Sequence, residues 1–465
     1  MEGWGKGLDP VRAFERLRTP PYSYLLESVG GVPETSRYSI LGSRPEAVIR
    51  GKGARIERHE KGRVSRLKDT PFGVLRTLTA EFSLSRGGGT PPFFGGIIGF
   101  FAYDLARFIE HLPSPPKDDL DCPDFVFLLV DTVVVFDHEL RKADLIHTPL
   151  PEAMEKMDRE ALYRQGAEKL EDLLERLSRP GTGTSPAREA LPAPDPDMTR
   201  DEYIRMVERC REYIAAGDIY QANLSQRFSV PFNGDPWRLY QALRAINPSP
   251  FSGYLELDDF QLISASPERL IRLKEGVLDT RPIAGTRPRG KTGREDEGMR
   301  VELLTSEKER AEHLMLVDLE RNDLGRVSET GSVTVNELMT VEGYSHVLHI
   351  VSNIRGRLSP GKSPADVIEA VFPGGTITGV PKVRCMEIIS ELEPFARGPY
   401  TGSFGYISLS GELDLNIIIR SFLIKNKTAF FQVGGGIVAD SDPFQEYDET
   451  IYKAAALMKA LSGEQ

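Results

Sequence analysis

Residues 252–266 read SGYLELDDFQLISAS, a stretch rich in strand-forming residues. Comparable runs recur along the second half of the chain and alternate irregularly with helical patterns; they are NLSQRFSVPF (223–232), GSFGYISLSG (402–411), LNIIIRSFLI (415–424) and TAFFQVGGGIV (428–438). A regular βαβ array would alternate strand and helix evenly. The sequence therefore predicts an α+β fold, in which large, mostly antiparallel sheets are covered by helices.

The first part of the chain is also rich in strands. Its β-rich runs are SRYSILG (36–42), EAVIRG (46–51), ARIERH (54–59), FFGGIIGFFAY (93–103) and FVFLLVDTVVVF (125–136). The most apolar stretches, 93–102 and 125–136, are shorter than the roughly 20 residues that a membrane-spanning helix needs, and the second contains Asp131. We interpret both as buried strands.

The segment 178–198, SRPGTGTSPAREALPAPDPDM, is rich in proline and has neither helical nor strand periodicity. This composition predicts a linker or a long surface loop. A helix is expected before it, over 160–177, and another after it, opened by a capping box of Thr199 and Glu202 and ended by Gly217. We expect an N-terminal region over 1–178, a linker over 179–198 and a C-terminal region over 199–465. The two regions would form one interwoven fold, because each alone leaves sheet edges to pair.

Composition excludes several classes of function. The chain has 465 residues, with 58 Lys and Arg against 69 Asp and Glu, a net charge of −11 that argues against a nucleic-acid partner. The three cysteines form no C-x-x-C pair, and an odd number suits a reducing compartment. The N-terminal MEGWGKGLDP lacks the apolar segment of a signal peptide. We expect a cytoplasmic protein.

Two pairs of glutamates could bind a metal ion. Glu309 and Glu312 are three residues apart in a helical segment, and Glu446 and Glu449 have the same spacing near the start of the last helix. This spacing places both carboxylates of a pair on one helix face. Two such pairs that face each other could hold a hard divalent ion such as Mg²⁺. The competing interpretation of either pair alone is a solvated helix face.

Two glycine-rich segments and one histidine are further candidates. Gly434–Gly436 follow an apolar strand, and their N–H groups could bind a carboxylate or phosphate; a bulge or tight turn is the competing interpretation. The sequence GGT at 374–376 allows the same two interpretations. His349 lies in an apolar, strand-like context, where a histidine alone is more often a hydrogen-bonded core residue than a catalyst.

Read together and in order, these segments resemble the chorismate-utilising enzymes. The resemblance is dense over about 199–460 and rests on SASPERL, TRPIAGTRPRG, EKERAEHLMLVDLERNDLGRV, YSHVLHIVS, FPGGTITGVPKVRCMEIISELEP, GPYTGSFGY, DLNIIIRSF and VGGGIVADSDPFQEYDET. LLESVGG and SRYSILG near the N-terminus match one branch, the large subunits of anthranilate synthase and aminodeoxychorismate synthase. The fold implied is two large antiparallel β-sheets packed face to face, with helices outside.

The resemblance implies a role for each residue that matches a family motif. It places Glu268 as the general acid that helps the C4 hydroxyl leave, and His349 as a catalytic histidine near that centre. It places Mg²⁺ on the two glutamate pairs. The residues expected to contact chorismate are Thr286, Thr376, Tyr400, Arg420, Gly434, Gly436 and Lys453. Chorismate is a dianion, so the positive charges of Mg²⁺, Arg420 and Lys453 would offset the four carboxylates.

Gln221 indicates the nucleophile. The salicylate and isochorismate synthases of this family carry at this position a lysine that activates water. An amide cannot act as a base, so the resemblance implies that ammonia is used. The chain shows no nucleophilic Cys/His motif of its own. A glutamine amidotransferase partner, component II, would then supply the ammonia.

The product is either aminodeoxychorismate, the precursor of 4-aminobenzoate in folate synthesis, or anthranilate with pyruvate, in tryptophan synthesis. The double glycine of FPGGTITG, the sequence GGGIVADSDP and the segment DLNIIIRSF resemble aminodeoxychorismate synthase component I. Ala284 departs from it, because many of those enzymes have a lysine there that is proposed to attack C2, whereas anthranilate synthases have alanine. We expect aminodeoxychorismate as the product, and anthranilate is the alternative.

A tryptophan site is a further hypothesis. The segments 25–28 and 247–251 resemble such a site, formed by Leu26, Glu27, Ser28, Asn247, Pro248 and Phe251. The competing interpretation gives Ser28 and Arg37 purely structural roles. A non-catalytic, tryptophan-binding regulatory chain is the remote alternative, but it would predict the loss of catalytic residues, and only Ala284 departs from the family pattern.

Overall fold

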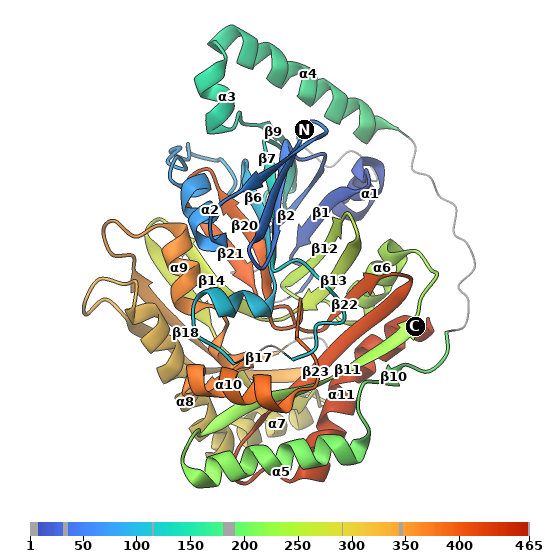
Figure 1. The fold of residues 1–465 in the computed structure, drawn as a ribbon, viewed down its shortest axis with the longest axis vertical. Coiled ribbons are helices and arrows are strands. Elements are labelled where there is room, and N and C mark those ends of the chain that lie inside the picture. Colours follow the sequence, from blue (N-terminus) through green and yellow to red (C-terminus); the bar gives the residue numbers. More distant parts are fainter. Residues whose placement is uncertain are drawn as a thin grey trace.

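Two large antiparallel sheets form the centre of the molecule (Figure 1). The computed structural model describes residues 8–30, 36–113, 116–179, 191–290, 292–343 and 347–463, without the side chains of Thr286 and Val347. In this part of the chain one sheet has 11 strands and the other has 12.

The 11-stranded sheet runs in the order β10-β11-β23-β22-β13-β12-β1-β2-β8-β9, and β19 pairs with β11. Its strands are β1 (Tyr22–Glu27), β2 (Tyr38–Ser43), β8 (Thr132–Asp137), β9 (Lys142–His147), β10 (Asp195–Pro196), β11 (Gln221–Pro231), β12 (Phe251–Leu257), β13 (Phe260–Ser266), β19 (Gly379–Val380), β22 (Ser421–Lys425) and β23 (Thr428–Ile437). Strands from both predicted regions therefore share this sheet, since β1 pairs with β12.

The 12-stranded sheet runs in the order β16-β18-β15-β14-β21-β20-β6-β7-β3-β4-β5, and β17 pairs with β18. Its strands are β3 (Ala47–Lys52), β4 (Arg55–Glu60), β5 (Arg63–Leu67), β6 (Gly96–Phe101), β7 (Phe125–Val130), β14 (Arg269–Lys274), β15 (Val277–Arg281), β16 (Ile283–Pro288), β17 (Thr334–Gly343), β18 (Val347–Arg357), β20 (Ser403–Ser408) and β21 (Leu413–Asn416). The two regions mix here as well, because β6 pairs with β20.

Helices lie outside the sheets (Figure 1). They are α1 (Pro10–Leu17), α2 (Pro71–Thr79), η1 (Tyr103–Phe108), α3 (Pro151–Lys156), α4 (Arg159–Ser178), α5 (Arg200–Ala216), α6 (Pro236–Ile246), α7 (Gly293–Thr305), α8 (Glu307–Gly325), α9 (Pro364–Val371), η2 (Gly375–Ile377), α10 (Lys382–Leu392) and α11 (Pro443–Ser462).

The sheets pack face to face through a layer of apolar side chains. Phe100 of β6 meets Phe260 of β13 across this layer, with ring centroids 5.7 Å apart. Two further cores lie on the outer faces: α2 and α9 cover the 12-stranded sheet, and α1, α6 and α11 cover the other. Burial of this apolar surface is the main driving force for the fold. The predicted fold class, two face-to-face antiparallel sheets with helices outside, is confirmed.

Local predictions agree with the structure at helix ends. Thr199 and Glu202 form the predicted capping box at the start of α5, and Gly217 ends that helix in the left-handed conformation, with φ 83°. The helix predicted over 160–177 is α4.

Two strand predictions differ from the structure. The run 125–136 is two strands in different sheets, β7 and β8, separated at Asp131. The proline-rich segment contains the short strand β10, which pairs with Phe228 and Ser229 of β11. Residues 180–190 of that segment lie outside the described residues.

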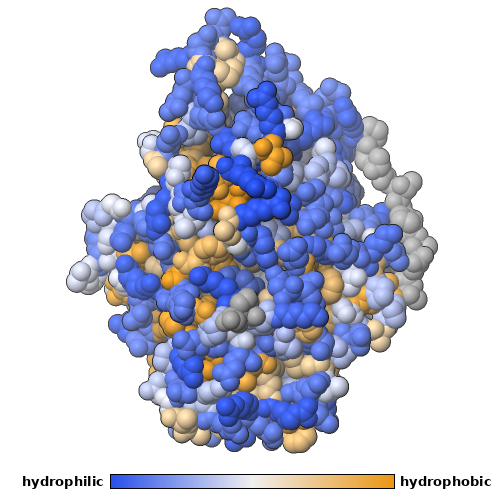
Figure 2. Space-filling view, in the orientation of Figure 1, coloured by the Kyte–Doolittle hydropathy of each residue, from blue (hydrophilic) through white to orange (hydrophobic). Residues whose placement is uncertain are grey.

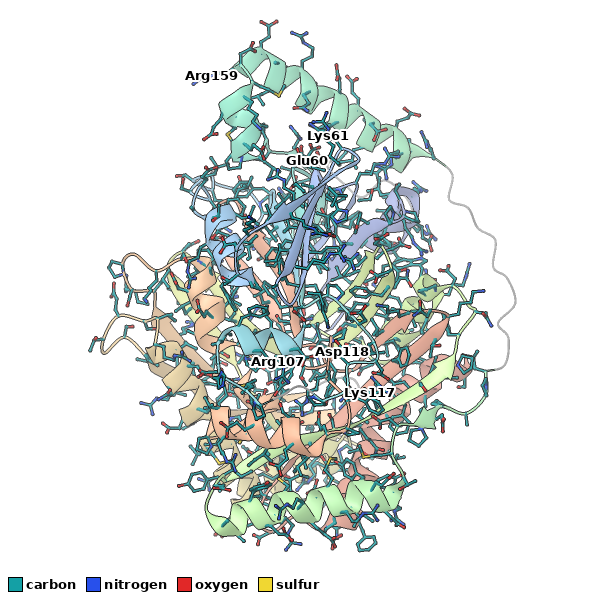
Figure 3. The ribbon with its side chains drawn as sticks, viewed as in Figure 1. Glu60, Lys61, Arg107, Lys117, Asp118 and Arg159 are labelled. Atoms are coloured by element: carbon teal, nitrogen blue, oxygen red, sulfur yellow. The ribbon has the colours of Figure 1, made fainter. Side chains whose placement is uncertain are left out.

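Charged side chains join the outer elements to the sheets. Figure 3 labels Glu60 and Lys61 at the tip of the β4–β5 hairpin, which lies beneath α3 and the start of α4 at Arg159. Next to this tip, Arg58 pairs with Glu152 of α3 at 2.6 Å.

Hydrophilic residues predominate on the face seen in Figure 2, and hydrophobic ones form small groups. Among the described residues, no helix is long and apolar enough to cross a membrane.

Candidate active site

The candidate residues gather where one end of each sheet meets two helices, in the lower half of Figure 1. The 11-stranded sheet contributes β11 and β23, and the 12-stranded sheet contributes β16 and β18. Helices α8 and α11 pack against these strands and carry the two glutamate pairs. Segments that are far apart in the sequence thus bring most of the predicted residues to one place.

The glycines of β23 allow a close approach of side chains. A Cβ atom on Gly436 would lie 2.2 Å from Gln221 Nε2 and 3.2 Å from Glu312 Oε1. A Cβ atom on Gly434 would lie 2.5 Å from the carbonyl oxygen of Leu224. These glycines are regularly paired residues of β23, so the bulge or turn interpretation is wrong for them. Glycine is required here because a side chain would clash with neighbouring atoms, not because of the backbone conformation.

The glutamates converge on this stretch but already have partners. Beside Gly435 lie Glu446 Oε2 and Glu449 Oε1, at 3.5 and 3.8 Å from the position of its missing Cβ. Gln221 Nε2 donates to Glu312 Oε1 at 2.7 Å, and Lys453 Nζ lies 2.7 Å from Glu449 Oε1. The fourth glutamate, Glu309, instead pairs with Arg287 at 3.0 Å.

The chemistry of these carboxylates suits a divalent cation. Burial and the neighbouring Glu309 raise the pKa of Glu312, and burial and Glu449 raise the pKa of Glu446. Lys308 and Lys453 lower both pKa values but do not cancel these effects, so a divalent cation would relieve the remaining repulsion, and oxygen donors are the ligands of Mg²⁺. In the described part of the chain, however, no three acidic, histidine or cysteine side chains are already close enough together to hold a metal ion.

Glu268 lies in the turn between β13 and β14 and is 5% exposed. Burial, helped by the nearby Glu320, raises its pKa to about 8 against the lowering effects of Thr376 and the backbone of Ile283. The Ile283 N–H points at Glu268 Oε1 from 3.5 Å. A carboxyl group with this pKa keeps its proton at neutral pH, as a general acid must.

His349 and Arg420 provide a neutral and a charged group. Burial lowers the pKa of His349 to about 4, so its imidazole is neutral at pH 7. Its Nδ1 lies 3.1 Å from the carbonyl oxygen of Gly285, which only accepts, so Nδ1 carries the proton. Arg420 has φ 54°, and burial lowers its pKa. Its guanidinium has no carboxylate partner among the described residues, which suits an anionic ligand.

Unpaired polar atoms mark the same place. The side-chain oxygens Gln221 Oε1, Asn223 Oδ1 and Thr376 Oγ1 are buried without a hydrogen-bond partner in the described structure. Thr376 lies close enough to Glu268 to lower the pKa of that carboxyl, but its hydroxyl meets the criteria of a hydrogen bond to none of the described residues. Buried polar groups normally find partners, so these three oxygens indicate a site that a ligand completes.

Ala284 and Thr286 lie on β16, and Tyr400 lies in the segment between α10 and β20. Ala284 pairs with Ile350 of β18, and Thr286 pairs with His349. The side chain of Thr286 lies outside the described residues. Tyr400 follows α10, and burial raises its pKa.

The segments of the hypothetical tryptophan site also lie side by side. Val29 N donates to the Ser249 carbonyl at 3.1 Å, so the residues after β1 contact those before β12. The carboxylate of Glu27 accepts hydrogen bonds from Tyr240 and Arg244. Glu27 therefore has a structural role, and tryptophan binding stays a prediction.

Sequence reasoning missed a buried ion pair next to the site. Arg397 bonds to Glu393 through Nε and Nη2, at 2.8 and 2.7 Å, and both side chains are almost fully buried. The same guanidinium donates to the carbonyl oxygens of Ile377 and Asn223, at 2.9 and 2.6 Å. It thereby links β11 to the turn that carries Thr376. The only signal in the sequence was the i, i+4 spacing of Glu393 and Arg397. Exposed ion pairs have the same spacing, so it does not reveal burial.

Comparisons with known proteins agree with this geometry. The model of the chorismate binding enzyme family matches residues 32–459. The chain is 46% identical to aminodeoxychorismate synthase component 1 of Bacillus subtilis, over 97% of this chain and 94% of that protein. It is 44% identical to anthranilate synthase component 1 of Thermus thermophilus, over 97% and 95%.

A solved structure agrees over almost the whole chain. Anthranilate synthase component I from Streptococcus pneumoniae superposes with a TM-score of 0.82, at 36% identity and 98% coverage of both chains. The menaquinone-specific isochorismate synthase of Escherichia coli, at 19% identity and a TM-score of 0.72, shares the fold. The chain therefore belongs to the chorismate binding enzyme family.

Proposed function

We propose that this chain is the chorismate-aminating component of an aminodeoxychorismate synthase. It would replace the C4 hydroxyl of chorismate with an amino group from ammonia and release water. The observation that carries the proposal is a buried, protonated Glu268 in the same site as Arg420, a partly buried cation without a carboxylate partner among the described residues. Protonated Glu268 can donate a proton to a leaving hydroxyl, and Arg420 can pair with a carboxylate of the substrate.

Positive groups of the chain would bind the dianionic substrate. Arg420 would pair with one carboxylate of chorismate. Lys453, which now donates to the Gly434 carbonyl oxygen at 3.0 Å, lies beside Gly435 at the same site. The hydroxyl of Thr376 has no hydrogen-bond partner among the described residues and is available to the ligand.

Glu268 would donate its proton to the leaving hydroxyl. General acid catalysis of this kind is typically worth about 10²–10⁴-fold in rate. His349 is neutral and holds its proton on Nδ1, so it would act beside the reacting carbon by polarity rather than by charge.

Mg²⁺ is part of the proposal. Glu309, Glu312, Glu446 and Glu449 would hold it, and the bound ion would supply positive charge to a substrate carboxylate. Gln221 and Lys453 would then serve to orient Glu312 and Glu449.

Ammonia is the proposed nucleophile because Gln221 is an amide and has no basic group. Ammonia needs only delivery and orientation. The relatives are named component 1, which supports a second component that supplies ammonia from glutamine.

Anthranilate synthesis is the second candidate, and Ala284 favours it. Without an amine at this position the chain cannot form a covalent adduct with the ring there. Identities of 41% and 44% to anthranilate synthases, against 46% to an aminodeoxychorismate synthase, support both candidates. We favour aminodeoxychorismate because the segments 372–379 and 434–443 resemble that enzyme.

Product analysis tests the proposal. The purified chain is incubated with chorismate, Mg²⁺ and an ammonium salt at alkaline pH. Anthranilate is detected by its fluorescence, and aminodeoxychorismate as 4-aminobenzoate after a separate lyase is added. We expect mainly 4-aminobenzoate, and no product when glutamine replaces ammonium.

Three outcomes would contradict parts of the proposal. Anthranilate as the sole product would assign the chain to the second candidate, and glutamine use by the chain alone would remove the need for a partner. Undiminished turnover of Glu446→Ala in EDTA would refute the metal site. A melting curve of that variant serves as the control for folding.

A further inference from the structure

Glu320 is a buried acid behind the site to which the proposed mechanism gives no role. It lies on α8, eight residues after Glu312, and is 3% exposed. Its Oε1 accepts a hydrogen bond from the N–H of Gly375 at 3.3 Å. Its Oε2 lies 2.9 Å from the hydroxyl of Thr280.

Both contacts lead to the segments that surround Glu268. Gly375 immediately precedes Thr376, which lies beside the Glu268 carboxyl. Thr280 is near the end of β15, three residues before Ile283, whose N–H points at the same carboxyl. Glu320 therefore holds two separate backbone segments against the proton donor.

The direction of the hydrogen bonds at the Thr280 hydroxyl depends on whether Glu320 is protonated. The Thr280 hydroxyl lies 3.0 Å from the Leu270 carbonyl oxygen and 2.9 Å from Glu320 Oε2. A hydroxyl has one proton to donate, and a carbonyl oxygen can only accept. The hydroxyl can therefore donate to Leu270 while Glu320 carries a proton, and it donates to Glu320 once that carboxyl is ionised, which favours the ionised form.

The charges around Glu320 are mostly negative. Asp323 lies on the same helix, Glu268 lies on the strand side, and the cation Lys382 of α10 lowers the pKa of Glu320. Lys382 is already bound to Asp323 and to the Val371 carbonyl oxygen. Burial, followed by Asp323, raises the pKa of Glu320 toward neutrality. Glu320 therefore gains its charge in the pH range where Glu268 must still hold a proton.

We propose that Glu320 is a positioning residue for Glu268: it fixes the two segments that hold the Glu268 carboxyl, and its negative charge keeps the proton on that carboxyl as the pH rises. The inference rests on the proposed function, in which Glu268 is the proton donor. Glu320 itself does not touch the substrate. Like charges in a buried site oppose each other's ionisation, so loss of one proton makes the second harder to remove.

Glu320→Gln tests the inference. Glutamine keeps the shape, accepts from Gly375 and donates to Thr280, but it never becomes negative. With free ammonia held at a saturating level, we expect kcat to be unchanged near pH 6 and about tenfold lower near pH 9, because Glu268 loses its proton at lower pH. KM for chorismate should stay the same.

Two further variants make the result specific. Thr280→Val removes the hydroxyl that stabilises ionised Glu320, so it should shift the alkaline limb of the pH profile in the same direction, and it serves if Glu320→Gln does not fold. Glu256→Gln is the matched control, because Glu256 is a buried carboxylate paired with Arg18 at 2.9 Å, away from the site. Its pH profile should match that of the unmutated chain.

Infrared titration gives a readout that does not require turnover. The band of a protonated carboxyl that is lost in Glu268→Gln should disappear at lower pH in Glu320→Gln than in the unmutated chain. An unmoved band, an unmoved alkaline limb, or an equal loss of kcat at every pH would overturn the inference. Absence of any product from the unmutated chain would instead overturn the proposed function, and the band would still test the coupling.

Discussion

Single residues in this site differ from their ordinary states because the fold removes water from them. Glu268 keeps a proton, His349 loses one, and Arg420 holds a charge without a carboxylate partner in the described structure. The first two states follow from burial, which disfavours unpaired charge, whereas a guanidinium stays charged even when it is partly buried. The arrangement suits a reaction in which an anion binds and a hydroxyl leaves.

The first residue-scale prediction concerns Glu268→Gln. Glutamine preserves the shape but cannot donate a proton, so kcat should fall by about 10²–10⁴-fold with little change in KM. Because the pKa of Glu268 is about 8, the unmutated activity should decline as the pH rises through that value, and the variant should lack this limb. Steady-state kinetics from pH 6 to 9 measure both effects. A higher KM at constant kcat would make Glu268 a binding residue only.

The second concerns Ala284. With no amine there, ammonia would add at C2 first while the protonated C4 hydroxyl leaves as water. The bound intermediate would then either lose pyruvate to give anthranilate, or take a second ammonia at C4 and release the C2 amino group as ammonia. A difference of about 1.4 kcal/mol between the two barriers gives a tenfold product ratio. We expect mainly aminodeoxychorismate with detectable anthranilate, and Ala284→Lys should suppress the anthranilate about tenfold.

Ala284→Met is the control for Ala284→Lys, because it adds length without an amine. Equal suppression by both variants would show that bulk, not the amine, decides the product. Mass spectrometry of the intact chain during turnover tests the premise. A chorismate-derived adduct on the unmutated protein would refute it.

At the scale of elements, local signals predicted helix ends well and long-range partners poorly. The capping box of Thr199 and Glu202 depends on neighbouring residues, and it forms as predicted. The run 125–136 splits between two sheets because its partners, β3 and β6 for β7 and β2 and β9 for β8, come from other parts of the chain. Spacing could suggest Glu309 and Glu312 as a pair, but not that Glu309 would bind Arg287.

Buried charged residues were the main omission. Glu320 looks like an ordinary charge on a helix and Arg397 like one in a loop, and only the packed structure shows that both are buried and hold the turn at Gly375–Ile377. The residues of the site that sequence did indicate were found through the family motifs. Periodicity alone left each of them with a structural alternative.

The element-scale prediction concerns the link between β11 and that turn. Arg397→Met leaves the carboxylate of Glu393 buried without its cation, which should cost about 3–5 kcal/mol in the free energy of unfolding. Chemical denaturation measures this loss. Arg179→Met is the control, because Arg179 and Glu175 are an exposed pair and should contribute at most about 1 kcal/mol. An equal effect of both substitutions would contradict the structural role of Arg397.

At the scale of the whole molecule, the regions 1–178 and 199–465 share both sheets. β1 lies between β2 and β12, and β6 lies between β7 and β20, so each region supplies a neighbour that the other lacks. The layer between the sheets likewise combines side chains from both regions. The boundary suggested by the proline-rich segment therefore separates parts of the sequence rather than independent cores.

This arrangement predicts the behaviour of a divided chain. A protease site inserted between residues 180 and 190 should allow cleavage without separation, because the two pieces remain paired along β1–β12 and β6–β20. The pieces should elute together in size-exclusion chromatography and separate only in denaturant. Residues 1–178 expressed alone should aggregate, since the free edges of β1 and β6 are apolar and unpaired. Co-expression with 191–465 should restore a soluble complex with the activity of the intact chain. A soluble 1–178 piece with its own cooperative unfolding transition would show instead that the N-terminal region folds independently.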